Sequence, residues 1–450
     1  MKQYSKSASV FLLLLLGLDG IIILLQTVFG DEKMKKRIIT GVSLVLVVVI
    51  ALGIIIPLLR PEYSGVNYNS ADVHNKTDKT IKFDSKGKLK ILHITDTHLK
   101  LNHNFDPTIW LVENACEKEK PDIVMLTGDV VFNYDDAETT KKMINALMNV
   151  FDSRNIPVAV TFGNHDSEQG AMTREELMAY YNTFSCSVSV DDGEALSGCG
   201  TYNIPVLSSD GEKVKFNLWV FDSGDYDEEG RYNCVKPDQI EWYKKISDKL
   251  RAENNGQAVN SLVFQHIIVG EIYDALKKSD SWKSYSYKHL YNKEEYYMFD
   301  PDCVNYGTIR ETPCPGYQNF GQFEAMVEKG DVLAMFTGHD HTNAFGVKYK
   351  GIDIVNSLST RYISLCHSTQ CGYRVIEVDE NDTSDYETRV VRIFDTYDFE
   401  TVKEEKQKGD ISTYLMACEF AVKGKFQKFA TDVYGKFIEA VTGREVTYPD

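Results

Sequence analysis

The chain has 450 residues, of which 43% are hydrophobic and 26% are charged, and 49 Lys and Arg against 66 Asp and Glu give a net charge of -17. Its 30 glycines, 11 prolines and nine cysteines are ordinary or low numbers for this length, which excludes a disordered chain, a collagen-like repeat and a disulfide-dense miniprotein. Residues 61–450 hold 42 basic and 63 acidic residues, a net charge of -21, which would repel a phosphate backbone and argues against a nucleic-acid partner.

A long apolar segment near the N-terminus predicts a membrane anchor. Residues 38–59 include no charged side chain over 22 positions, enough to cross about 30 Å of hydrocarbon as a helix. A cleaved signal peptide is the alternative, but the run exceeds the usual h-region of about 7–15 residues and no small-residue cleavage site follows it. The basic residues of 33–37 favour the cytoplasm, so everything after Arg60 is expected on the exterior or luminal side.

An earlier apolar run, residues 10–29, is interrupted by glycines and one aspartate. It is either a second membrane span or a segment that precedes the true translation start at Met34. Both alternatives leave the predicted membrane topology unchanged. The predicted organisation is a membrane anchor at 1–60, a polar stalk at 61–88, a main domain at 89–400 and a helical extension at 401–450.

Short apolar or β-branched runs alternate with helical patterns along the main domain. The predicted strands are 89–95, 123–127, 156–162, 215–221, 261–265 and 332–337. The predicted helices are 107–120, 137–151, 173–184 and 237–251. This alternation predicts a layered α/β fold with catalytic groups where strands end. Residues 280–320 are rich in aromatic side chains, do not fit the alternation, and are predicted to form a lid-like insert.

Five short polar blocks each follow a predicted strand. They are Asp96-Thr97-His98, Gly128-Asp129, Gly163-Asn164-His165-Asp166, His266 and Gly338-His339-Asp340-His341. Any one of them alone is more often a turn or a helix cap, but together they hold five of the ten histidines. Mixed carboxylate, imidazole and amide ligands suit Fe, Mn or Zn, and the absence of a Cys-x-x-Cys motif argues against a structural zinc module.

In order and spacing, these blocks resemble the signature of the calcineurin-like metallophosphoesterase superfamily over residues 88–360. The sequence around the blocks is similar to the purple-acid-phosphatase-like branch of that superfamily. The resemblance implies a four-layer α/β/β/α sandwich of two mixed sheets and two divalent or mixed-valence transition metal ions (Fe, Mn or Zn). By that resemblance the first ion would be held by Asp96, His98, Asp129 and His341. The second would be held by Asp129 as a bridge with Asn164, His266 and His339.

The resemblance also implies a role for two residues of the third block. His165 would supply a proton to the leaving oxygen, and Asp166 would orient its ring. One position departs from the purple enzymes, which have a tyrosine three residues after the bridging aspartate, where this chain has Phe132. The site is therefore expected to lack the tyrosinate-to-iron colour.

Taken together, these features predict a membrane-anchored phosphoesterase that depends on two metals. A hydroxide bridging the two ions would attack the ester of a phosphorylated substrate or small phosphoester. The alternative is a catalytically silent scaffold of the same fold that binds a protein partner. The complete ligand set and the presence of His165 favour the enzyme, and the choice between monoesters and diesters stays open.

Overall fold

The computed structural model describes residues 80–102, 105–132, 136–168, 170–190, 196–281, 286–298, 304–362 and 371–393. The predicted membrane anchor, most of the predicted stalk and the predicted C-terminal extension lie outside these ranges. Among the described residues, none of the helices combines the length and the apolar character needed to span a bilayer.

The first of two large sheets has five strands in the order β15-β14-β1-β2-β3. Its strands are β1 (Lys88–Ile94), β2 (Ile123–Thr127), β3 (Val158–Thr161), β14 (Gly372–Asp379) and β15 (Asp382–Arg392). The strands β1, β2 and β3 run parallel, whereas β14 pairs antiparallel with both β1 and β15. All five residues of β2 are buried, as expected for a central parallel strand covered on both faces.

The second sheet has seven strands in the order β10-β12-β13-β11-β6-β5-β4. Its strands are β4 (Tyr202–Leu207), β5 (Val214–Val220), β6 (Ser261–Phe264), β10 (Val304–Thr308), β11 (Val332–Thr337), β12 (Ala344–Tyr349) and β13 (Ile352–Asn356). The four central strands run parallel, and β4, β10 and β12 are antiparallel to their neighbours. Both sheets are therefore mixed, as predicted.

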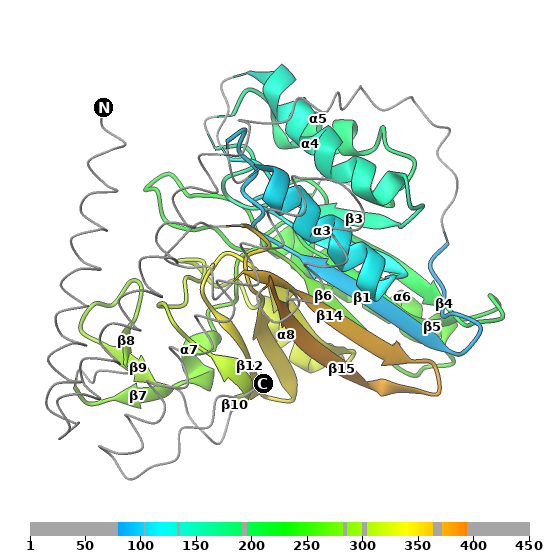
Figure 1. Cartoon of the computed structure of the whole chain (residues 1–450). Coiled ribbons are helices and arrows are strands. Elements are labelled where there is room, and N and C mark those ends of the chain that lie inside the picture. Colours follow the sequence, from blue (N-terminus) through cyan, green and yellow to red (C-terminus); the bar gives the residue numbers. More distant parts are fainter. Residues whose placement is uncertain are drawn as a thin grey trace, which may run out of the picture.

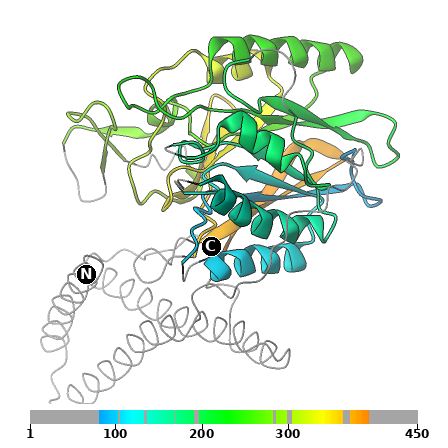
Figure 2. The same cartoon turned by 90° about the horizontal axis from the view of Figure 1, so that it is seen from above.

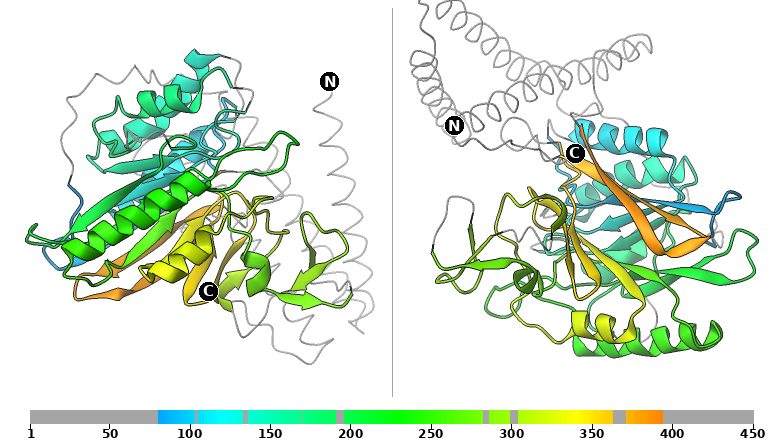
Figure 3. Two further views of the ribbon diagram at one scale, coloured as in Figure 1. Left: turned by 180° about the vertical axis from the view of Figure 1, so that it is seen from behind. Right: turned by 90° about the horizontal axis from the view of Figure 1, so that it is seen from below.

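Helices cover the outer face of each sheet, and the inner faces pack on each other (Figures 1 and 2). Apolar side chains of α3 (Phe105–Glu119), α4 (Ala137–Asp152) and α5 (Arg174–Tyr181) form one core with the first sheet. Those of α6 (Pro237–Glu253), α7 (Ile272–Ala275) and α8 (Gln322–Lys329) form another core with the second sheet. A third core lies between the sheets, so the fold is the expected α/β/β/α sandwich (Figure 3).

Residues 80–88, which the sequence assigns to a polar stalk, belong to the domain instead. Ile81 and Phe83 lie in the core between the sheets, and Phe83 is 0% exposed. Lys82 forms a parallel bridge with Leu207 at the end of β4. Two apolar residues alternating over three positions make too short a pattern to distinguish an edge segment from a linker.

The insert at 280–320 also differs from an irregular lid. The short strands β7 (Lys277–Ser279), β8 (Tyr287–Lys288) and β9 (Tyr296–Met298) form a small sheet in the order β7-β9-β8, which projects from one end of the sandwich (Figure 1). The next strand, β10, completes the edge of the seven-stranded sheet by pairing with β12. Part of the predicted lid is thus a structural strand of the main fold.

Candidate metal centre

The five polar blocks meet at the carboxyl ends of five strands from both sheets. Asp96, Asp129 and Asn164 follow the adjacent parallel strands β1, β2 and β3, while His266 and His339 follow the adjacent strands β6 and β11. Because parallel neighbours end at the same edge, each sheet contributes one cluster of ligands, and the packing of the sheets joins the two clusters.

The side-chain ligand atoms of the first set lie close to one another. The Nε2 atom of His98 lies 2.8 Å from Nε2 of His341, 3.7 Å from Oδ1 of Asp96 and 3.6 Å from Oδ2 of Asp129. Donors at about 2.1 Å from one ion in a tetrahedron are about 3.4 Å from each other, so these spacings fit a shared cation. The four ligand atoms all lie within 4.8 Å of one another.

The second set shares Asp129 with the first. The Nε2 atom of His266 lies 3.3 Å from Oδ2 of Asp129, and one ligand atom each of Asp129, His266 and His339 fall within 4.8 Å of one another. Asn164 joins this set through its loop, because the backbone N–H of His165 donates to Oδ1 of Asp129 at 2.8 Å. The five predicted Asp and His ligands other than Asp129 therefore each place a ligand atom within 4.8 Å of one on Asp129.

In several ligand side chains, one polar atom makes hydrogen bonds within the protein and the other makes none. Asp96 accepts hydrogen bonds from Thr95 and from the backbone N–H of His339 through Oδ2 alone, and His266 uses Nδ1 on the carbonyl oxygen of Thr127. Among the ligand residues, the buried atoms that make no hydrogen bond are Asp96 Oδ1, His98 Nδ1, Asp129 Oδ2, Asn164 Oδ1, His266 Nε2 and His339 Nε2. Buried polar atoms are costly unless paired, so this convergence of unpaired donors fits a pair of bound metal ions.

Strained backbone holds the ligands in place. Asp96, His98, Asp129 and His339 all have positive φ angles, between 40° and 70°, which cost side-chain-bearing residues about 1–3 kcal/mol each. Close approach also requires glycine: a Cβ atom at Gly338 would lie 2.4 Å from Oδ2 of Asp96. Such concentrated strain is typical of a functional site.

His165 lies beside the first set of donors, but its partner is not the predicted one. Its ring centroid is 5.4 Å from that of His98 and 5.2 Å from that of Phe132. Its Nδ1 atom is 2.5 Å from Oε2 of Glu168. The prediction that Asp166 orients His165 is therefore wrong, because residues adjacent in sequence point in different directions at this turn.

Asp166 instead ties together the loops that follow β2 and β3. Its Oδ2 atom accepts the backbone N–H groups of Asp129 and Gly163 at 2.7 and 2.8 Å, and its Oδ1 atom accepts that of Val130 at 2.8 Å. Asp166 thus fixes the backbone that carries Asp129 and Asn164, and it is a positioning residue rather than a partner of His165.

Three further contributors to the site carry no motif that the sequence analysis singled out. Glu168 pairs with His165, and Tyr226 accepts a hydrogen bond from the amide of Asn164 at 2.8 Å. Arg174 donates to the carbonyl oxygen of Gly163 at 2.8 Å and forms a salt bridge with buried Asp222. The available signal for Glu168 is an acidic side chain three residues after His165, and the sequence offers none for Tyr226.

The centre has unequal proton affinities in the metal-free protein. Burial alone would lower the pKa of His266, but the carboxylates of Asp129 and Asp96 outweigh it and raise that pKa to about 10. Burial lowers the pKa of His339 to about 3 and also lowers that of His98. At neutral pH His266 is therefore protonated, whereas His98 and His339 are neutral.

Metal binding is expected to release at least one proton at neutral pH, because a ligating imidazole must be neutral and His266 begins charged. In the folded, metal-free protein the pKa of His266 is about 10, above the 6.5 of an unperturbed histidine. The ion pair of His266 with the carboxylates therefore stabilises the folded state fully below pH 6.5, and this stabilisation is lost as the pH rises towards about 10. Calorimetric titration of Mn²⁺ in buffers of different ionisation enthalpy measures the proton count. A count of zero at neutral pH would contradict this assignment.

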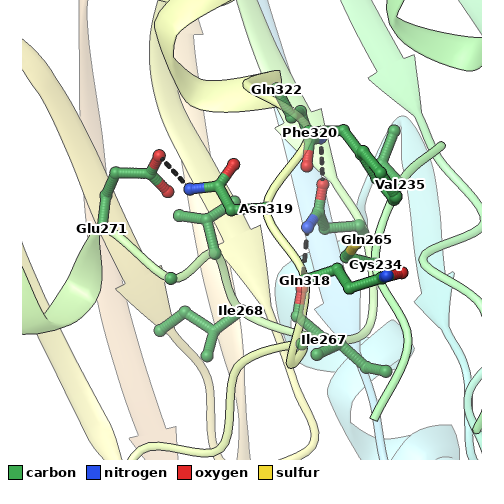
Figure 4. Close-up of a pocket in the computed structure, with 13 residues that line it drawn as sticks. Cys234, Val235, Gln265, Ile267, Ile268, Glu271, Gln318, Asn319, Phe320 and Gln322 are labelled. Atoms are coloured by element: carbon green, nitrogen blue, oxygen red, sulfur yellow. Dashed lines mark hydrogen bonds between the residues drawn. The ribbon is translucent and has the colours of Figure 1, made fainter. Parts of the chain in front are cut away.

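A separate hollow lies beyond His266, and its polar groups satisfy one another (Figure 4). Gln322 donates to Gln265 at 2.6 Å, Gln265 donates to the carbonyl oxygen of Ile267 at 2.7 Å, and Asn319 donates to Glu271 at 2.7 Å. These hydrogen bonds hold the segment after β6 against the loop before α8, and they thereby help to fix the position of His266.

A family model described as calcineurin-like phosphoesterase matches residues 89–343. The chain is 27% identical over 310 residues to the Arabidopsis thaliana protein named probable inactive purple acid phosphatase 29, covering 61% of this chain and 72% of that protein. It is 28% identical over 221 residues to the phosphatase DCR2 of Saccharomyces cerevisiae, covering 43% and 37%. A solved dimetal phosphatase from Danio rerio aligns with a TM-score of 0.42 and 13% identity, over 67% of this chain and 98% of that one.

Proposed function

Because the chain belongs to the calcineurin-like phosphoesterase family, we propose that it hydrolyses phosphate esters at a centre of two transition metal ions. The observation that carries this proposal is the convergence of two carboxylates, four imidazoles and one amide at the carboxyl ends of five strands, with buried donor atoms left unpaired. These donor types suit Fe, Mn or Zn.

The residues divide into two ligand sets that share Asp129. Asp96, His98, Asp129 and His341 would hold one ion, and Asp129, Asn164, His266 and His339 would hold the other. When bound, the ions would offset the negative charge of the phosphate ester and lower the pKa of a water molecule between them. Without metal ions, the two buried carboxylates would repel the negatively charged phosphate ester. Substrate binding, as well as the hydrolysis step, therefore requires the cations.

His165 is the proton donor in this proposal. Glu168 engages its Nδ1 atom, which fixes the ring and leaves Nε2 to transfer a proton to the departing oxygen. The ring is only partly exposed, with a side-chain exposure of 25%, and lies next to the His98 ring, so it is both accessible to substrate and close to the first ligand set. Asp166 and Arg174 hold the backbone on which Asn164 and His165 stand.

A second candidate is a silent scaffold of the same fold, which the name of the Arabidopsis relative favours because it calls that protein probable inactive. A scaffold has no need for strained ligands or for unpaired buried donors, and both are present here. These features therefore favour the enzyme.

Hydrolysis of an aryl phosphate and an aryl phosphodiester, with added Mn²⁺ or Fe²⁺, separates the two candidates. The His165→Ala variant is expected to be about 100-fold slower with unchanged metal content, since general acid catalysis contributes about 10²–10⁴-fold. The Asn164→Ala variant is expected to lose both activity and affinity for the second ion. Equal rates for the unmodified protein and both variants would favour the scaffold.

We also propose that residues 38–59 anchor the protein, with the phosphoesterase domain on the exterior or luminal side. The support is the charge-free run of 22 residues and the basic residues before it. The full chain is expected to stay in the membrane pellet after alkaline carbonate extraction, whereas a chain lacking residues 1–59, and with them both apolar runs, moves to the supernatant. Recovery of both chains in the supernatant would refute the anchor, and protease protection in sealed vesicles reports the side.

A further inference from the structure

A short hairpin at residues 225–233, which we call the tyrosine hairpin, borders the second ligand set. Its ends are joined by the backbone N–H of Asn233, which donates to the carbonyl oxygen of Asp225 at 3.0 Å. Its tip is closed by the side chain of Asp227, which accepts hydrogen bonds from the backbone N–H and the Nε atom of Arg231 at 2.9 and 2.7 Å. The hairpin is therefore held in one conformation by its own contacts.

Two tyrosines project from this hairpin towards the ligands of the second set. Tyr226 and Tyr232 form an antiparallel bridge, so their side chains lie on the same face, and their rings stack with centroids 5.5 Å apart. The Tyr226 hydroxyl accepts a hydrogen bond from Nδ2 of Asn164 at 2.8 Å. The Tyr232 ring meets the ring of His339 edge to face at 4.3 Å.

The contact with Tyr226 anchors the Asn164 amide in one orientation, with Nδ2 on the hydroxyl and Oδ1 left without a hydrogen bond. An amide has a donor end and an acceptor end, and only the oxygen can ligate a metal ion. Because Nδ2 donates to Tyr226, Oδ1 is the amide atom left buried without a hydrogen-bond partner. Without the hydroxyl, nothing among the described contacts of Nδ2 would prevent the amide from turning its nitrogen inward.

We propose that Tyr226 is a positioning residue that sets the affinity of the second metal site by holding the amide oxygen of Asn164 towards it. This inference rests on the proposed two-metal centre. The hydroxyl acts from outside the ligand set, and removal of such supporting hydrogen bonds typically weakens metal binding about 10- to 100-fold. The Tyr232 ring contacts the His339 ring, and no hydrogen bond from the Tyr232 hydroxyl to a ligand is present among the described residues.

The test measures Mn²⁺ affinity in a His341→Ala background, which removes a ligand of the first set only and leaves the second set complete. Adding Tyr226→Phe is expected to weaken the remaining site about 10- to 100-fold. Tyr232→Phe is the matched control, because it deletes a hydroxyl from the same hairpin, keeps the ring beside His339, and removes no contact with Asn164. It is expected to change the affinity less than twofold.

A double-mutant cycle separates positioning from general damage. In an Asn164→Asp background either carboxylate oxygen can ligate, so the orientation of the side chain no longer matters, and Tyr226→Phe is expected to have little further effect. An equal loss with Asn164 intact and in the Asn164→Asp background would overturn the positioning role, as would an unchanged affinity in Tyr226→Phe. Absence of Mn²⁺ binding in the unmodified protein would overturn the proposed centre itself, which is a different result from either.

Discussion

Replacing Asp129 with asparagine is expected to lower kcat/KM by about 10⁴-fold or more, the largest loss at any single position of the chain. Asp129 belongs to both ligand sets, and its Oδ2 atom is 3.6 Å from His98 Nε2 and 3.3 Å from His266 Nε2. Each metal ion is expected to contribute several kcal/mol of transition-state stabilisation, and 1.36 kcal/mol corresponds to tenfold in rate. Asparagine tolerates the positive φ of 51° at this position, so the backbone is expected to survive the change.

Metal analysis and a substrate assay on the same preparation check this prediction. The variant is expected to retain fewer than two ions per chain, because an amide oxygen is a weaker ligand than a carboxylate and cannot neutralise two cations. Asp331→Asn is the control, because that carboxylate is also buried but lies at the amino end of β11, away from the ligands. A fully active Asp129→Asn protein would contradict the shared-ligand assignment.

The ligands could be predicted from the sequence because each one directly follows a buried strand. Asp96, Asp129, Asn164, His266 and His339 stand two or three residues past the last apolar positions, so a local pattern places them at the same edge. The parallel strands β1, β2, β3, β5, β6 and β11 were predicted from their short apolar runs, whereas the central strands β13 and β14 were missed. Local signals repeated five times thus locate the polar blocks, whereas the division of their residues between two ions followed from the family resemblance.

The supporting residues could not be predicted because their roles depend on what lies opposite them in space. Glu168 and Asp166 are both acidic neighbours of His165, and only the structure shows that Asp166 faces three backbone amides while Glu168 reaches the ring. Tyr226 is 62 residues from Asn164 along the chain. The strand β15 was missed because it is mostly exposed at the sheet edge and lacks an apolar run.

Replacing Arg174 with methionine is expected to destabilise the domain by about 3–5 kcal/mol, the largest loss of stability expected for a single substitution among those proposed. The Arg174 side chain is only 10% exposed and pairs with Asp222, whose side chain is 0% exposed, so removing Arg174 leaves a buried carboxylate without a counterion. Asp222 also accepts the backbone N–H groups of Cys199 and Gly224 at 2.8 Å each, so it cannot turn out to solvent. Methionine keeps most of the side-chain volume, so the loss reports the charge and its hydrogen bonds.

Urea denaturation of the metal-free protein measures this loss, and Arg154→Met is its matched control. Arg154 pairs with Glu117 at 3.1 Å, but the glutamate is 54% exposed, so its removal is expected to cost about 1 kcal/mol or less. The double variant Arg174→Met with Asp222→Asn removes both charges and is expected to regain part of the stability. Activity is not expected to return with it, because the hydrogen bond from Arg174 to the carbonyl oxygen of Gly163 is still missing beside Asn164. Recovery of both stability and activity would show that Arg174 supports the fold and has no part in positioning the ligand loop.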